Sequence, residues 1–190
     1  MNLLILCRPG FEPEAAAEIT DHAARDGIAG YPETTRGEGW VRFHAFDDTA
    51  PSHTRPPTDL IFARQCVRVI ADLPQLDPGD RVTPMLLALR EHGVTKLGDM
   101  LVEHPDSDAA RPLAGLARSF GNALRPALRR AGLLGEKPTT RLPCLHVCFL
   151  AGTHAVLGLS HPRDGRVWPQ GIPRLRVRAE ARRGRGNAAH

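Results

Sequence analysis

The chain has 190 residues, of which 42% are hydrophobic and 24% are charged. These values are typical of a globular protein and exclude wholesale disorder. The apolar runs are too short to span a bilayer, and the first residues carry neither a basic region nor a small-residue cleavage site. We therefore expect a cytoplasmic protein with no membrane partner.

The net charge of +4 is unevenly distributed along the chain. Residues 163–190 contain eight arginines and two acidic residues, a local charge of 8 − 2 = +6. The rest of the chain therefore carries a charge of 4 − 6 = −2. Arginine outnumbers lysine 23 to 2, and guanidinium groups suit bidentate contacts with phosphate. The alternative for the count is the codon usage of a GC-rich genome.

The N-terminal third predicts a small sheet covered by a helix. Leu3–Cys7 is expected to form a strand, and Arg8-Pro9-Gly10 a turn. Pro13 suits the first turn of a helix whose apolar positions recur at helical spacing, and Trp40–Phe46 alternates as a strand does. Residues 47–57 are rich in Pro, Ser and Thr and predict a boundary, so residues 1–57 are expected to be a ferredoxin-like subdomain.

The remainder predicts alternating strands and helices, and therefore an α/β fold of the α+β sandwich kind, with helices packed on one face of a sheet. Residues 58–177 are assigned to this second domain and residues 178–190 to a disordered Arg/Gly tail. Its expected elements are a strand at Leu60–Ile70, a helix capped by Thr83 and running to His92, a strand at Leu97–Val102, a helix at Arg111–Ala131 that Gly121-Asn122 or Pro126 could divide, and strands at Leu142–Gly152 and Thr153–Ser160.

The helix expected at 111–131 carries a row of arginines. At 100° per residue, four of them fall within roughly 40° of one another, opposite an apolar face; they are Arg111, Arg118, Arg125 and Arg129. The row contains no acidic residue, so it predicts a ridge that binds phosphate groups. The alternative is an ordinary solvated helix face.

Further candidate RNA contacts lie next to the predicted strands and near the C-terminus. Arg8 and Arg64 stand at strand ends, where an arginine can reach a phosphate backbone; the alternative is an internal ion pair, which is the preferred interpretation for Arg64. Trp168 lies in a basic, irregular segment and is a candidate for base stacking, whereas Trp40 is expected to be buried. Arg174 and Arg176 complete the set of RNA-binding candidates.

No catalytic or metal motif is apparent in the sequence. Cys144, His146 and Cys148 share one face of a predicted strand, but three ligands along a strand spread too widely for a zinc site, so buried small side chains are the preferred interpretation. The sequence has no G-x-G-x-x-G, Walker, H-E-x-x-H or G-x-S-x-G motif. We predict no catalytic residue and no metal ligand.

Several of these segments together resemble a known family. LLILCRPGFE (3–12), DLIFARQ (59–65) and GIPRL (171–175) occur in the order typical of the N-terminal half of the bacterial ribosomal RNA large-subunit methyltransferase M family. The supporting segments are DRVTP (80–84), ALRPALRRAGLL (123–134) and RLPCLHVCF (141–149). The resemblance implies a ferredoxin-like piece followed by a THUMP RNA-binding domain.

The family resemblance also implies a substrate and a cofactor. Members methylate a cytidine ribose 2′-hydroxyl in large-subunit (23S) ribosomal RNA, with S-adenosylmethionine held by a separate Rossmann-like domain. After Arg176 the family pattern would continue into that domain, whereas this sequence ends in VRAEARRGRGNAAH, which we expect to reflect a truncation or a change of frame. The resemblance therefore implies no cofactor in this chain and large-subunit ribosomal RNA as its partner.

Three functions remain open from the sequence. The first is an RNA-binding module that positions ribosomal RNA for methylation. The second is a protein-interaction domain that docks a separately encoded methyltransferase. The third, an enzyme acting alone, requires binding of S-adenosylmethionine by this chain.

Overall fold

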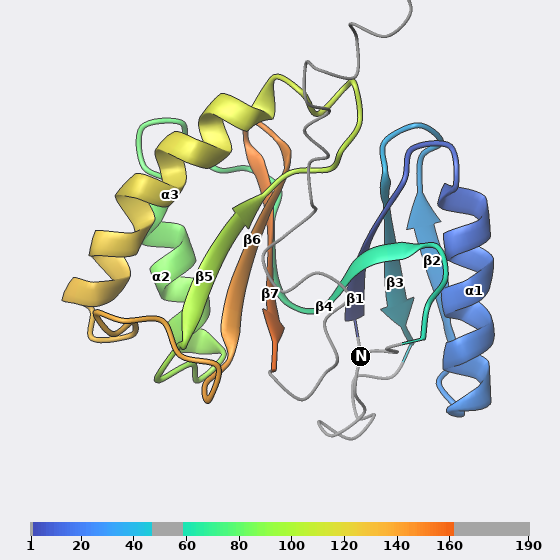
Figure 1. Cartoon of the computed structure of the whole chain (residues 1–190), viewed down its shortest axis with the longest axis horizontal. Helices are drawn as coiled ribbons and strands as arrows, with labels where there is room; N and C mark the ends of the chain where they lie inside the picture. Colours follow the sequence, from blue (N-terminus) through green and yellow to red (C-terminus); the bar gives the residue numbers. More distant parts are fainter. Residues whose placement is uncertain (1, 47–58, 162–190) are drawn as a thin grey trace, which may run out of the picture.

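A computed structural model describes residues 2–46 and 59–161 of the chain (Figure 1). These residues form a mixed α/β structure, as predicted. In chain order the elements are β1 (Asn2–Cys7), α1 (Glu12–Arg25), β2 (Gly30–Thr34), β3 (Trp40–Ala45), β4 (Ala63–Leu73), α2 (Val82–Glu91), β5 (Asp99–Glu103), α3 (Leu113–Arg130), β6 (Cys144–Ala151) and β7 (His154–Ser160).

The described strands join in a seven-stranded sheet with the order β2-β3-β1-β4-β7-β6-β5. β4 is its central strand: the first half pairs antiparallel with β1, and the second half pairs antiparallel with β7. β5 and β6 run parallel, and the other pairs are antiparallel. One continuous strand therefore connects the N-terminal and C-terminal parts of the sheet.

Two apolar cores lie under the helices. Along β1 the alternate residues Leu3, Ile5 and Cys7 pack with α1, while α2 and α3 pack over β5, β6 and β7 at the other end of the sheet (Figure 1). A third cluster contains Leu4 and Leu6 together with Cys148 and Val156. Because neighbouring strand residues point to opposite faces, the helices share one face and the third cluster lies on the other. The predicted placement of helices on one face is confirmed.

The structure corrects several predicted elements. β2 was not foreseen, since GYPET contains a proline and few apolar residues; it lies at the edge of the sheet, where proline is tolerated. The helix α2 is capped by Asp80, whose carboxylate accepts the backbone N–H groups of Val82 and Thr83, so the cap predicted at Thr83 is wrong. In α3 the helix is continuous through Gly121 and Pro126, and Arg111 precedes it.

Two boundaries expected from the sequence involve residues outside the described ranges. The Pro/Ser/Thr-rich segment 47–57 falls there, as do the end of the second domain and the tail at 178–190. The division at residue 57 therefore stays a prediction. Within the described residues, no helix is long and apolar enough to cross a membrane.

The turn between β1 and α1 is held by a fully buried carboxylate, Glu12. Its Oε2 atom accepts the backbone N–H of Gly10 at 2.9 Å, and its Oε1 atom accepts that of Gly39, in the β2–β3 hairpin, at 2.7 Å. Burial acts to raise the pKa of Glu12, but donation by the backbone N–H groups of Gly39, Gly37 and Gly10 outweighs it, so the pKa lies below its usual value. Glu12 thus joins the turn to the hairpin.

We expect Glu12→Gln to lower the free energy of unfolding by about 2 kcal/mol at neutral pH, because a neutral amide replaces a charged acceptor. Since the folded-state pKa lies below the ordinary value of 4.5, the carboxylate stabilises the fold fully above that pH and progressively less as the pH falls through the folded-state pKa. Urea denaturation of wild type and variant at neutral pH and at about pH 3 measures this. A difference of equal size at both pH values would contradict the assignment.

Candidate nucleic-acid interface

Two of the motifs singled out in the sequence meet in one cavity. The turn after β1 and the segment leading into β4 enclose a pocket of about 310 Å³, which we call the Arg8–Arg64 pocket. Its described lining residues are Arg8, Phe11, Leu60, Ile61, Phe62, Ala63 and Arg64. The structure therefore brings together two of the predicted RNA-binding arginines, although they are far apart in the sequence.

The first wall of the pocket is the turn Arg8–Phe11. The backbone N–H of Phe11 donates to the carbonyl of Arg8 at 3.0 Å, and Gly10 has a φ of +92°, a conformation that favours glycine. Glu12 binds the N–H of Gly10 from below, as described above. The turn is therefore rigidly placed, and it presents the exposed side chains of Arg8 and Phe11 at the end of β1.

The second wall, Leu60–Ala63, is held by a carboxylate from α1. Glu18 accepts the backbone N–H of Ile61 at 2.6 Å and that of Phe62 at 3.0 Å. Leu60 and Ala63 are buried in the core under α1, whereas the side chain of Ile61 is 83% exposed. The wall is thus anchored at its backbone and directs an apolar side chain outward.

Arg64 occupies a β-bulge between β1 and β4. Leu6 pairs with Gln65 and Cys7 pairs with Ala63, so Arg64 is the extra residue on β4. Bulges redirect a side chain and are frequent beside functional sites. The guanidinium of Arg64 lies 2.8 Å from the carboxylate of Asp106, and both side chains are partly exposed. The ion pair considered for Arg64 in the sequence analysis is therefore present.

Aromatic rings line the pocket beside the arginines. The rings of Phe11 and Phe62 are stacked, with centroids 6.0 Å apart and planes inclined by 24°. The guanidinium carbon of Arg8 lies 5.8 Å from the centroid of the Phe11 ring, in cation–π contact. This pair was not predicted from the sequence, because the two rings come from segments far apart in the chain.

Beneath the pocket, the thiol of Cys7 is unreactive. Burial, and next the charge of Glu12, raise its pKa to about 12, although Arg64 acts in the opposite direction. The thiol therefore stays protonated at neutral pH and does not act as a nucleophile. The chemistry available in the pocket is cationic and aromatic: it can bind an anion and stack against a flat ring.

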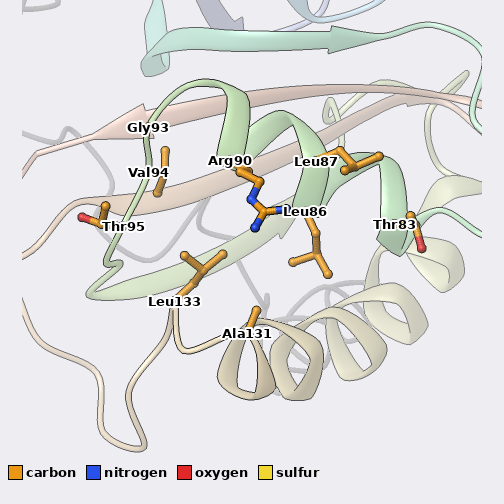
Figure 2. Close-up of a pocket in the computed structure, with 9 residues that line it drawn as sticks. All are labelled: Thr83, Leu86, Leu87, Arg90, Gly93, Val94, Thr95, Ala131 and Leu133. Atoms are coloured by element: carbon orange, nitrogen blue, oxygen red, sulfur yellow. The ribbon is translucent and has the colours of Figure 1, made fainter.

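A larger cavity of about 600 Å³ lies between α2, the loop that follows it, and the end of α3 (Figure 2). Its walls are mostly apolar, with Leu86, Leu87, Val94 and Leu133 among them, and Arg90 contributes a guanidinium. Leu87 is 51% exposed. Among the described residues, none predicted to bind RNA lines this cavity, which is suited to an apolar group more than to a polyanion.

Comparisons with known proteins found two family models that match this chain. A model of the RlmM ferredoxin-like domain matches residues 1–67, and a model described as ribosomal RNA large subunit methyltransferase M, N-terminal, matches residues 80–161. The ribosomal RNA large subunit methyltransferases M of Xanthomonas campestris and Stenotrophomonas maltophilia are 57% and 53% identical to this chain over 181 residues. The chain therefore corresponds to the N-terminal portion of the ribosomal RNA large subunit methyltransferase M family.

The match to the methyltransferase M family covers its N-terminal portion. The aligned region is 95% of this chain but only 51% of the Xanthomonas protein, so the chain spans about half the length of such relatives. Among solved structures, TrmN from Thermus thermophilus aligns with 83% of this chain and 44% of its own, with a TM-score of 0.51 and 19% identity. That likeness supports the fold alone.

The arginine row predicted on α3 is not an uncompensated ridge. Arg125 lies 2.9 Å from the carboxylate of Asp99 and also donates to the carbonyl of Met100. Arg129 donates to the carbonyl of Glu136 and lies 3.6 Å from its carboxylate. Arg111 pairs with Asp108 in the turn before the helix, at 2.5 Å.

The premise that nothing neutralises the row is therefore wrong at three of its four positions. Arg118 is exposed and makes no ion pair with the described residues. The carboxylates that pair with the other three come from outside the helix, so the helical wheel could not reveal them. Whether any of these arginines contacts RNA stays a prediction.

The remaining candidates divide between buried and undescribed residues. Trp168, Arg174 and Arg176, with the GIPRL segment, lie outside the described ranges. Cys144 and Cys148 are buried, as predicted, and burial raises the pKa of the Cys148 thiol well above its usual value. Between them on β6, the imidazole of His146 is hydrogen-bonded to Gln65 at 3.1 Å and to Ser160 at 2.8 Å.

We expect the two kinds of α3 arginine to differ in their effect on stability. Arg125→Ala should lower the free energy of unfolding by about 1 kcal/mol, because it removes the link between α3 and β5. Arg118→Ala should change it by less than about 0.5 kcal/mol. Urea denaturation of both variants measures the difference, and equal effects would show that the Arg125 contacts do not stabilise the fold.

Proposed function

We propose that this chain is an RNA-binding module that holds large-subunit ribosomal RNA for methylation. The observation that carries the proposal is the Arg8–Arg64 pocket, where two arginines and two stacked phenyl rings converge on one partly open cavity. Its relatives are named for ribosomal RNA of the large subunit, and arginine is well suited to phosphate. The RNA backbone supplies those phosphates.

The two pocket arginines are free to exchange partners. Arg8 makes a cation–π contact with Phe11, worth about 0.5–1 kcal/mol at an exposed site. Arg64 makes a partly exposed ion pair with Asp106, a kind of pair worth about 0–1 kcal/mol. A phosphate group offers stronger, charge-assisted hydrogen bonds. Binding RNA therefore costs little in lost internal contacts, in contrast to Arg125 with its two anchors.

The described residues do not suit S-adenosylmethionine. Its sulfonium group is cationic, whereas the Arg8–Arg64 pocket presents two guanidinium groups and the larger cavity presents Arg90. The parallel pair β5–β6 is followed, after β5, by His104–Asp108, which contains no glycine for a nucleotide-binding turn. In this proposal the cofactor is bound by a methyltransferase domain, which would lie in the half of the longer relatives that this chain does not match.

We predict that the double variant Arg8→Ala/Arg64→Ala binds a large-subunit ribosomal RNA fragment more weakly than wild type. Loss of two phosphate contacts should reduce the slope of log K against log salt concentration by about 1.4, at about 0.7 per contact with single-stranded RNA. Filter binding across a salt series measures both quantities. Because both side chains are partly or largely exposed, the variant should remain folded.

Arg25→Ala is the matched control, since Arg25 is exposed at the opposite end of α1 from the pocket. Its affinity and salt slope should equal those of wild type. If the double variant also keeps the wild-type slope while wild type binds RNA, the contact surface lies elsewhere and the role proposed for this pocket is wrong.

A second candidate function is docking of a methyltransferase domain, including one encoded separately. It is favoured by the apolar cavity beside α2, where Leu87 is exposed and a single guanidinium, from Arg90, lines the described wall (Figure 2). An apolar surface with one cationic group fits a partner segment that carries apolar side chains and a carboxylate.

Leu87→Glu tests the docking candidate, because it places a negative charge on the apolar surface without disturbing a buried side chain. We expect at least about a tenfold loss of affinity for the methyltransferase half of a relative, measured by calorimetry. Leu142→Glu, at another exposed leucine, serves as the control. Unchanged affinity of the Leu87 variant would exclude this surface.

A further inference from the structure

We infer that the Arg8–Arg64 pocket takes a single unpaired nucleotide, and that it accepts any of the four bases. The inference rests on the proposed function and specifies the form of RNA that the pocket binds. In it, the base stacks on the Phe11–Phe62 pair while the flanking phosphates contact Arg8 and Arg64.

The pocket has features that phosphate binding alone does not require. Phe11 is 39% exposed and Ile61 is 83% exposed, so two large apolar side chains flank the guanidinium groups at the surface. In a double helix the bases are paired and stacked inside, and only the backbone is available to such a surface. Unpaired bases expose flat faces that stack on aromatic side chains. The apolar walls therefore favour an unpaired nucleotide over a duplex.

The position of Arg8 makes the ring accessible when phosphate arrives. The guanidinium of Arg8 lies over the Phe11 ring, which also stacks with Phe62. When Arg8 turns to a phosphate, it uncovers the face of Phe11 for a base. One nucleotide can therefore satisfy the arginine and occupy the ring together.

The described lining offers almost nothing that could read the edge of a base. Apart from the two arginines, its side chains are all apolar, with no amide, hydroxyl or carboxylate. The backbone N–H groups of Ile61 and Phe62 already donate to Glu18. Sequence readout depends on hydrogen bonds to base edges, whereas stacking is available to every base. The pocket should therefore be tolerant of base identity.

The test uses two RNAs of equal length and charge: a hairpin whose loop contains 2-aminopurine, and a blunt duplex with 2-aminopurine in a pair. We expect wild type to bind the hairpin at least about tenfold more tightly, and the loop fluorophore to change emission as it stacks. Loops that contain A, C, G or U in place of the fluorophore should bind within about threefold of one another.

Phe11→Leu keeps apolar bulk but removes the aromatic face, and should weaken hairpin binding about fivefold or more while leaving duplex binding unchanged. Ile61→Ala, at a largely exposed position, is a second variant that does not depend on a packed ring and should reduce the preference for the hairpin by about twofold. Tyr31→Leu is the control, since Tyr31 is an exposed aromatic residue outside the pocket.

The outcomes separate this inference from the proposed function. Suppose hairpin and duplex bind equally, and Arg8→Ala weakens this binding but Phe11→Leu does not. That result would overturn the inference that the pocket binds an unpaired nucleotide, and it would leave the proposed RNA binding intact. A strong preference for one base would overturn the inference that the pocket accepts any of the four bases. If wild type binds neither RNA, the proposed function itself fails, and the exposed apolar walls would then mark a protein-binding surface.

Discussion

The arrangement of the candidate site depends on β4, which among the described strands pairs with both parts of the sheet. Its first residues complete the core under α1, and its later residues join the core under α2 and α3. The bulge at Arg64 lies where β4 begins, next to the end of β1. Without the bulge, regular antiparallel pairing would set Arg64 opposite Cys7, whose side chain lies in the core under α1, and the two motifs would not share a pocket.

Buried and exposed carboxylates have different roles around the pocket. Glu12 and Glu18 bind backbone N–H groups, so they fix the two walls and do not neutralise an arginine. Asp106 pairs with Arg64 at the surface, where water competes for both groups. The walls are therefore rigid while the cations stay exchangeable, a combination suited to a phosphate ligand that must be bound and released.

Much of the fold could be predicted from the sequence, because apolar periodicity and turn residues are local. The strands at β1, β3, β6 and β7 and the helix α1 follow their patterns closely. Arg8 and Arg64 could also be predicted as candidate RNA contacts, since each stands beside a predicted strand. The convergence of these two arginines in one pocket could not be predicted, because it depends on a bulge and on antiparallel pairing. The ion pairs along α3 could not be predicted either, because Asp99 and Glu136 lie outside the helix.

The central claim is that RNA contacts this chain at the Arg8–Arg64 pocket and not along α3. Ultraviolet cross-linking of the whole chain to a large-subunit ribosomal RNA fragment, followed by mass spectrometry of the peptides, tests it most directly. The account predicts nucleotide adducts on Phe11 or Phe62, since stacked aromatic rings cross-link to bases at close range. Adducts confined to the exposed face of α3 around Arg118 would contradict it.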